Sequence, residues 1–196
     1  MASPRPILRL EITLKDIEPP IWRRIEIPSS STFWELHVAI QDSMGWCDCH
    51  LHEFCATDRS GDEIRVGIPD DAGWGEPTIP GWKRKLSPVF RRPGDKVLYS
   101  YDFGDGWEHS VVLESIESEQ PGLVYPRCLA GRRRCPPEDC GGPWGYAHLL
   151  EVMADPEHEE HADLLAWVDG SWDPETFDPE EVEFDDARER LKFVLR

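Results

Sequence analysis

The sequence predicts an α+β fold: a single domain over residues 1–196 with a largely antiparallel sheet, helices packed on one face of the sheet, and a helical C-terminal segment. Patterns typical of strands lie within residues 1–117, whereas patterns typical of helices concentrate in residues 142–196. Short turns join successive strands, which favours antiparallel pairs. The regular alternation of strands and helices that a doubly wound parallel sheet needs is absent from the sequence.

Two strands and a helix are expected first. Apolar and polar side chains alternate over residues 8–14 and again over residues 21–27, which is typical of half-buried strands. Thr32 and Glu35 then form the sequence of a capping box, apolar residues follow at helical spacing, and Gly45 supplies a helix end. We therefore expect a pair of strands followed by a helix of about three turns.

Two hairpins and a long loop are expected in the middle of the chain. Residues 49–57 and 64–68 are predicted to be strands joined by a polar turn. Residues 69–95 are predicted to be a long loop, because Pro and Gly are frequent at its start and no periodicity is sustained. Alternating residues over 97–113 surround a Gly-Asp-Gly turn, which predicts the second hairpin.

The C-terminal part is expected to be irregular at first and then helical. Residues 126–145 are rich in Pro and Gly and carry three cysteines. Three helices are predicted after them: one following residue 142, one with Asp155 as its N-cap and its end near Gly170, and one with Asp178 as its N-cap. One apolar face of the first helix is predicted to hold Ala147, Leu150 and Met153.

The chain is acidic, with 39 Asp and Glu against 21 Lys and Arg and a net charge of −18, most of it in residues 101–196. A surface of this sign repels a phosphate backbone, so nucleic acid is not expected as a partner. No apolar stretch approaches the roughly 20 residues of a membrane helix. The N-terminus lacks the apolar core of a signal peptide, so we expect a cytoplasmic protein without membrane contact.

The first candidate site is the segment Asp48-Cys49-His50-Leu51-His52-Glu53. In a strand, Asp48, His50 and His52 would share one face, and two imidazoles at this spacing can reach one cation. His50 and His52 are therefore candidate metal ligands. The alternative is that both histidines lie at the surface of a sheet or pack as half-buried aromatic side chains.

The second candidate site is the turn from Tyr101 to His109. Asp102, Asp105 and His109 could hold a divalent metal or supply a general base, which makes them candidate catalytic residues. Asp and Gly are also the residues that a hairpin turn demands, so the alternative is a purely structural turn.

The third candidate site is formed by Cys128, Cys135 and Cys140 in the Pro- and Gly-rich segment. Three thiols can hold zinc if one histidine completes a tetrahedral shell, and His50, His52 and His109 are the candidates for that place. The spacing differs from the paired Cys-x2-Cys of zinc ribbons. The alternative is that the cysteines are ordinary buried thiols.

Several motifs follow one another along the chain: Lys15-Asp16-Ile17-Glu18-Pro19-Pro20-Ile21-Trp22-Arg23-Arg24, Met44-Gly45-Trp46, His50-Leu51-His52-Glu53-Phe54, Tyr101-Asp102-Phe103-Gly104-Asp105-Gly106-Trp107-Glu108-His109, and Cys135-Pro136-Pro137-Glu138-Asp139-Cys140-Gly141-Gly142-Pro143-Trp144-Gly145-Tyr146. Together they closely resemble the Ri-plasmid open-reading-frame-three-like family over residues 7–185. The resemblance implies a single α+β domain of a plasmid-related family, some members of which are passengers on mobile insertion elements. It implies no established activity.

The main functional hypothesis is a binding module. Cys128, Cys135 and Cys140 would form its structural zinc centre, and an aromatic face beside the loop over residues 69–95 would receive a ligand or a protein partner. The residues of that face are Trp22, Trp46, Tyr101 and Trp107.

The alternative hypothesis is a metal-dependent, hydrolase-like enzyme. In it Asp102, Asp105 and His109, together with His52, hold a metal that activates water. This alternative requires His52 to lie close to Asp105. A weaker alternative is a nucleic-acid protein associated with mobile elements, for which the sequence offers no basic recognition helix.

Overall fold

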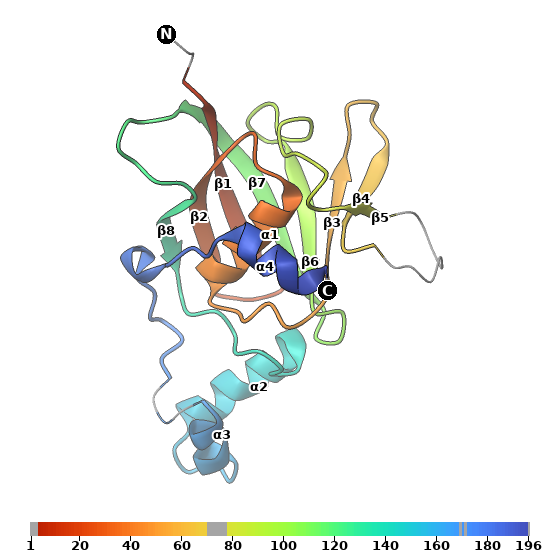
Figure 1. Ribbon diagram of the computed structural model, residues 1–196. Helices are drawn as coiled ribbons and strands as arrows, with labels where there is room; N and C mark the ends of the chain where they lie inside the picture. Colours follow the sequence, from red (N-terminus) through yellow and green to blue (C-terminus); the bar gives the residue numbers. More distant parts are fainter. Residues whose placement is uncertain (1–3, 70–77, 169, 171, 196) are drawn as a thin grey trace.

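An eight-stranded sheet forms the centre of the fold (Figure 1). The computed structural model describes residues 4–69, 78–168, 170 and 172–195. Within this part of the chain the strand order is β5-β4-β3-β6-β7-β1-β2-β8, and neighbouring strands are antiparallel except for the parallel pair β4 and β5. The strands are β1 (Pro6–Leu14), β2 (Trp22–Pro28), β3 (His52–Thr57), β4 (Glu63–Gly67), β5 (Thr78–Pro80), β6 (Lys96–Tyr101), β7 (Trp107–Ser118) and β8 (Arg127–Arg132).

The helices occupy two places around the sheet. Helices α1 and α4 lie over one face of it, whereas α2 and α3 pack against each other beyond one end of the strands (Figure 1). The helices are α1 (Phe33–Met44), α2 (Gly142–Ala154), α3 (His161–Trp167) and α4 (Ala187–Val194), with one short 3-10 turn, η1 (Pro179–Glu181). The predicted α+β class with a largely antiparallel sheet is confirmed, and α1 and α4 are its covering helices.

Helix α1 begins and ends where the sequence predicts. The Thr32 side chain accepts a hydrogen bond from the Glu35 backbone N–H, and the Glu35 carboxylate accepts one from the Thr32 backbone N–H at 2.7 Å. Gly45 adopts the left-handed conformation with φ 88°, and its N–H donates to the Gln41 carbonyl at 2.8 Å. Both ends of the helix are therefore capped by local interactions.

The two faces of the sheet differ in chemistry. On the inner face Leu10 lies between its partners Ile25 and Leu113, and all three are fully buried beneath α1. On the outer face ion pairs cross the strands: Arg24 contacts Glu114 at 2.5 Å and Glu11 at 3.2 Å. This one-sided burial is what an antiparallel sheet with a single helical layer requires.

Glu26 is the buried member of these outer-face ion pairs. It is 2% exposed and accepts hydrogen bonds from Arg9 and Arg127, each at 2.8 Å. Burial alone would raise the pKa of Glu26, but the hydrogen bonds and charges of the two guanidinium groups hold the pKa below its usual value. The carboxylate thereby connects β1, β2 and β8.

Two segments predicted to be loops contain strands. Residues 126–145 include β8, which pairs with β2 and completes one edge of the sheet. Residues 69–95 include β5, which pairs with β4 at the other edge, while the part of that prediction covering residues 70–77 lies outside the described residues. Both strands exist because an edge is available for pairing, which local composition does not reveal.

The C-terminal helices begin later than predicted. Asp155 accepts a hydrogen bond from the Glu157 N–H in a turn, and α3 begins only at His161. Asp178 caps a single 3-10 turn rather than a helix, and the last helix is α4, for which Asp186 accepts from the Arg188 N–H at 2.8 Å.

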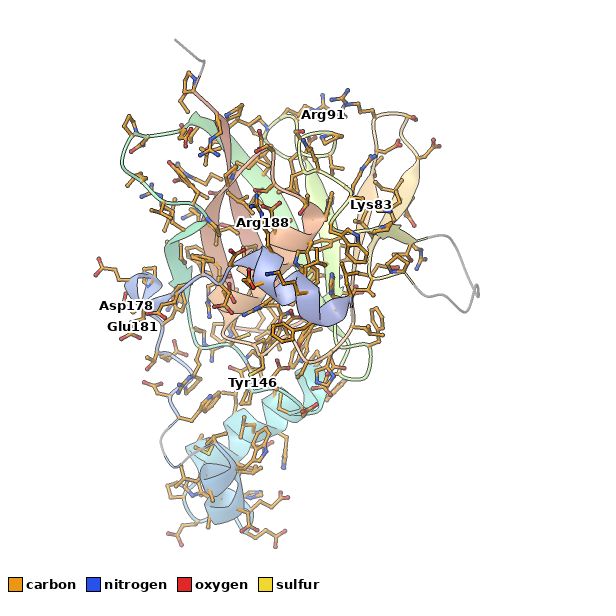
Figure 2. All side chains as sticks on the ribbon, viewed as in Figure 1. Lys83, Arg91, Tyr146, Asp178, Glu181 and Arg188 are labelled. Atoms are coloured by element: carbon orange, nitrogen blue, oxygen red, sulfur yellow. The ribbon has the colours of Figure 1, made fainter. Side chains whose placement is uncertain are left out.

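The buried face of α2 also differs from the predicted one. Tyr146, Leu149 and Val152 are buried, whereas Leu150 and Met153 are partly buried. Figure 2 places Tyr146 where α2 meets the end of the sheet. The stripe of α2 that is buried is therefore displaced by one residue from the predicted stripe, which is about 100° around the helix axis.

Replacing Glu26 with Gln should destabilise the protein by about 2 kcal/mol at pH 7, because hydrogen bonds to a buried charged group are lost. Since the folded-state pKa is depressed, this stabilisation is present above the unfolded pKa of about 4.5 and is lost as the pH falls through the folded pKa. Urea unfolding of both proteins at pH 7 and in stepwise more acidic buffer measures the difference. As a matched control, Glu117→Gln, which lies 3.7 Å from Arg9 at the surface, should change stability by less than about 0.5 kcal/mol.

Candidate metal centre

Three side chains that could ligate a metal lie close together beneath helix α4. They are His37 of α1, Asp48 of the segment between α1 and β3, and His52, the first residue of β3, and one potential ligand atom from each lies within 4.8 Å of the others. The His37 and His52 rings are stacked, with centroids 3.4 Å apart and planes 9° apart. His37 Nε2 lies 2.7 Å from Asp48 Oδ1. We refer to these three residues as the buried triad.

The local fold brings the triad together. Gly45 ends α1, so the chain turns back and places Asp48 beside the helix it has just left. Asp48 adopts a left-handed backbone with φ 55°, which Asp tolerates better than most residues, and its N–H donates to Gln41 Oε1. His52 is fixed by pairing with Tyr101 across β3 and β6. Each ligand is thus positioned by a different element.

His37 belongs to a closed hydrogen-bond network. Its Nδ1 lies 2.8 Å from the Tyr99 hydroxyl, which also accepts from Gln41 Nε2 at 2.9 Å. Burial, and then the charge of Arg190, lower the pKa of His37 well below its usual value, so the ring is neutral at pH 7. A neutral imidazole held at one nitrogen by a hydroxyl is the usual form of a metal-ligating histidine, because the outer partner orients the ring.

His52 has no hydrogen-bond partner for either ring nitrogen, although the residue is only 3% exposed. Burial, together with the neighbouring His37, lowers the pKa of His52 well below its usual value, so this ring too is neutral. A buried polar atom without a hydrogen bond lowers the stability of the folded protein by about 1–3 kcal/mol. Its presence in a native fold therefore requires an explanation, such as a bound ion. Burial also raises the pKa of Asp48, because the loss of hydration outweighs the opposing charges of His52 and Arg190.

Helix α4 covers the triad. Arg190 of α4 contacts Asp42 at 2.5 Å and Asp185 at 2.8 Å, and its Nη1 lies 3.7 Å from Asp48 Oδ2. The Trp34 indole N–H donates to the Ala187 carbonyl at 2.6 Å, which joins α1 to the start of α4. Asp48 therefore directs one oxygen to His37 and the other to a guanidinium group.

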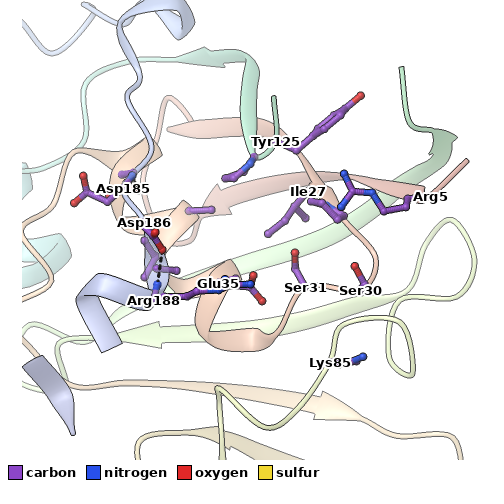
Figure 3. A pocket seen from close by; sticks show the side chains of 16 residues that line it. Arg5, Ile27, Ser30, Ser31, Glu35, Lys85, Tyr125, Asp185, Asp186 and Arg188 are labelled. Carbon is purple, nitrogen blue, oxygen red and sulfur yellow. Dashed lines mark hydrogen bonds between the residues drawn. The ribbon is translucent and has the colours of Figure 1, made fainter. Parts of the chain in front are cut away.

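A cavity of about 600 Å³ lies beside the start of α1 and the start of α4 (Figure 3). Its charged lining residues carry both signs: Glu35, Asp42, Asp185 and Asp186 accompany Arg5, Lys85 and Arg188. A lining with both signs of charge favours neither an anionic nor a cationic ligand. Among the residues of this cavity none belongs to a group of three metal-ligating side chains.

The first predicted site is divided between two places. Residues 49–51 are not part of β3, so the alternation expected of a strand does not hold there. Asp48 and His52 share one group of ligating side chains, and His50 belongs to other groups. His50 lies instead near Asp102 and Asp139. The predicted strand over residues 49–57 begins only at His52, and this later start separates the two histidines.

The turn residues predicted to be catalytic lie in three environments. Asp102 is near His50, Asp105 accepts a hydrogen bond from the Gly141 N–H at the start of α2, and His109 is fully buried beside Trp46 and Tyr99. The groups of metal-ligating side chains in the described part of the chain do not combine any two of them, and His52 belongs to the buried triad.

The cysteines do not form a ligand group either. Cys128 lies on β8, Cys135 is buried, and Cys140 precedes α2; none of the three joins a group of three ligating side chains in the residues that the structure describes. Burial raises the pKa of all three thiols, for Cys140 to about 12, so they are protonated at pH 7.

The predicted aromatic face is mostly interior. Trp107 and Tyr101 are fully buried and Trp46 is 4% exposed, because these rings fill the core between α1 and the sheet. Trp22 is half-buried, with the Arg24 guanidinium 5.0 Å from its ring. Within the buried triad, His37 is the residue that the sequence does not identify. Its signal was a polar residue on the apolar side of an amphipathic helix, next to Leu36 and Ile40.

Comparisons with known proteins agree with the resemblance. The chain matches the Plasmid pRiA4b ORF-3-like protein family over residues 6–181. It belongs to this family. It is 40% identical over 166 residues to the uncharacterized protein y4hQ of Sinorhizobium fredii (strain NBRC 101917 / NGR234), a match that covers 84% of this chain and 82% of the relative.

A solved structure shares the fold. The crystal structure of the protein of unknown function MM3350 from Methanosarcina mazei Go1 superposes with a TM-score of 0.84 at 43% sequence identity, over 93% of this chain and 100% of the other. Across the described residues, no helix has both the length and the apolar character that crossing a bilayer demands.

Replacing Arg190 with Met should loosen α4, because Asp42 would keep a buried carboxylate without its cation. We expect a loss of about 2 kcal/mol and faster amide exchange in residues 187–194. Urea unfolding and hydrogen exchange measure the two effects. Lys192→Met on the same helix, which breaks only an exposed pair with Glu189, is the matched control, and equal effects of the two variants would contradict the prediction.

Proposed function

We propose that this protein is a metal-binding module in which the buried triad, His37, Asp48 and His52, holds a zinc ion. The observation that carries the proposal is the His52 ring, which is buried with both nitrogens unpaired and has ligand atoms of His37 and Asp48 within 4.8 Å. The two rings are stacked, and one of them would turn out of the stack so that both in-plane lone pairs meet at the ion. Two neutral imidazoles and one carboxylate form a mixed nitrogen and oxygen set, which suits zinc.

The outer contacts of the triad support the same ion. The Tyr99 hydroxyl is placed to hold His37 Nδ1, and Arg190 is placed near the second oxygen of Asp48. The ion would replace the direct contact between His37 Nε2 and Asp48 Oδ1. Partners of this kind orient ligands and tune metal affinity. The metal would connect α1, the segment after it and β3.

The burial of the triad favours a structural ion over a catalytic one, because a catalytic ion needs a position open to substrate. We therefore place the binding-module hypothesis ahead of the hydrolase-like alternative, because no two of its residues Asp102, Asp105 and His109 share a group of ligating side chains in the described part of the chain. We also propose a cytoplasmic location, supported by the free thiols of all six cysteines, which suit a reducing compartment. The excess negative charge supports a protein or small-ligand partner rather than a nucleic acid.

The test is zinc content and stability in matched variants of the full chain. We expect the wild-type protein to bind about one zinc, measured by elemental mass spectrometry, and to gain about 5–10 °C in Tm at a free zinc concentration of 100 times Kd. His52→Leu should fold without zinc, because it removes two unpaired nitrogens, and should show neither the bound zinc nor the shift.

The control variant is His109→Leu, which changes an equally buried histidine outside the triad and should retain the zinc. Cys135→Ser should retain it as well. Zinc that persists in His52→Leu, or that is lost in Cys135→Ser, would contradict the proposed site and return attention to the cysteines.

A further inference from the structure

A second group of ligating side chains surrounds His50. One potential ligand atom each from His50, Asp102 and Asp139 lies within 4.8 Å of the others, and His50 also forms such a group with Cys49 and Glu138. The residues come from three separate segments: the approach to β3, the turn after β6, and the loop before α2. We refer to His50, Asp102 and Asp139, with Glu138 beside them, as the outer cluster.

Polar atoms of the outer cluster lack hydrogen bonds. Asp102 is only 6% exposed; its Oδ1 accepts from the Gly104 N–H, while its Oδ2 points toward His50 Nε2 at 3.6 Å, too far for a hydrogen bond. His50 Nε2 is buried and has no hydrogen bond, although Asp139 Oδ1 is 3.1 Å away. Glu138 Oε2 is likewise buried and unpaired.

The floor of the outer cluster is fixed. Glu138 Oε1 accepts from the Tyr101 hydroxyl at 3.0 Å and from the Cys47 N–H at 2.8 Å, so one of its oxygens is held and the other is available. Tyr101 is fully buried, and its hydroxyl also accepts from the Cys49 N–H at 3.2 Å. The Glu138 carboxylate beside His50 is thus held by the core of the protein, although the cluster itself lies at the surface.

The outer cluster differs from the buried triad in access and in ligand type. The side chains of His50 and Asp139 are 28% and 70% exposed, so solvent reaches the site. One imidazole and two carboxylates form an oxygen-rich set, which suits harder divalent cations such as Mn²⁺. An open site of this kind leaves positions on the ion for water or for an oxygen-bearing ligand.

We infer that His50, Asp102 and Asp139 of the outer cluster form a second, solvent-open divalent-cation site that binds Mn²⁺. The site is separate from the zinc centre proposed above and does not depend on it. The exposed side chains of Leu51 and Phe103, at 57% and 60%, follow two of its ligands directly in the chain.

Electron paramagnetic resonance of Mn²⁺ tests this site on the full chain loaded with one equivalent of zinc, because the six-line signal of the hydrated ion weakens when the ion binds. Zinc beyond one equivalent is left out, since it would compete for the same ligands. We expect one Mn²⁺ per chain, with affinity at least tenfold lower in His50→Ala and in Asp139→Asn. The second variant changes a largely exposed side chain, so it tests the ligand even if another substitution impairs folding. His52→Leu should bind Mn²⁺ as the wild-type protein does, which separates the two sites.

The matched controls are His148→Ala and Asp163→Asn, which change a histidine and an aspartate of α2 and α3 outside both groups. Both should leave Mn²⁺ binding unchanged. Mn²⁺ binding that survives at full affinity in His50→Ala and Asp139→Asn would show diffuse attraction to an acidic surface and overturn the site. Absence of binding to the wild-type protein at millimolar Mn²⁺ would overturn it as well.

Discussion

The burial of α1 against the inner face of the sheet is the constraint on which the rest of the structure depends. The helix is covered by α4 on its outer side, so even its polar residues His37 and Gln41 are fully buried. Their polar atoms need internal partners, and the Tyr99 hydroxyl serves both. The buried triad is thus built from the same contacts that hold the helix to the sheet.

Much of the fold follows from local signals in the sequence. The strands β1 and β2, the capping box of Thr32 and the end of α1 at Gly45 depend on neighbours in the chain, so the pattern predicts them. Strands β5 and β8 and helix α4 depend on distant partners. β8 needs the free edge of β2, and α4, which buries none of its own side chains, is held by Trp34 and by the acids that Arg190 contacts.

The sequence identifies only some residues of each candidate site, because the other residues are positioned by contacts with distant parts of the chain. Asp48 and His52 are separated by three residues, and their alternation suggests a common face. His37 comes from a helix whose pattern is explained by packing, and its one local signal, a polar residue on the apolar side, does not distinguish a metal ligand from a buried histidine. Asp48, Asp102 and Asp139 all adopt left-handed backbones, and no periodicity rule anticipates where such residues direct their side chains.

The position of α4 over the buried triad has a consequence for how fast an ion could be exchanged. A chelator in solution reaches a ligand atom only when the cover opens, and this cover is a short helix whose contacts include the Arg190 ion pairs and the Trp34 indole hydrogen bond. Release of a bound ion would then follow the frequency of local opening rather than the strength of the metal bonds. Such a centre could retain its ion through long exposure to competing buffers and still exchange quickly once the C-terminal helix is detached.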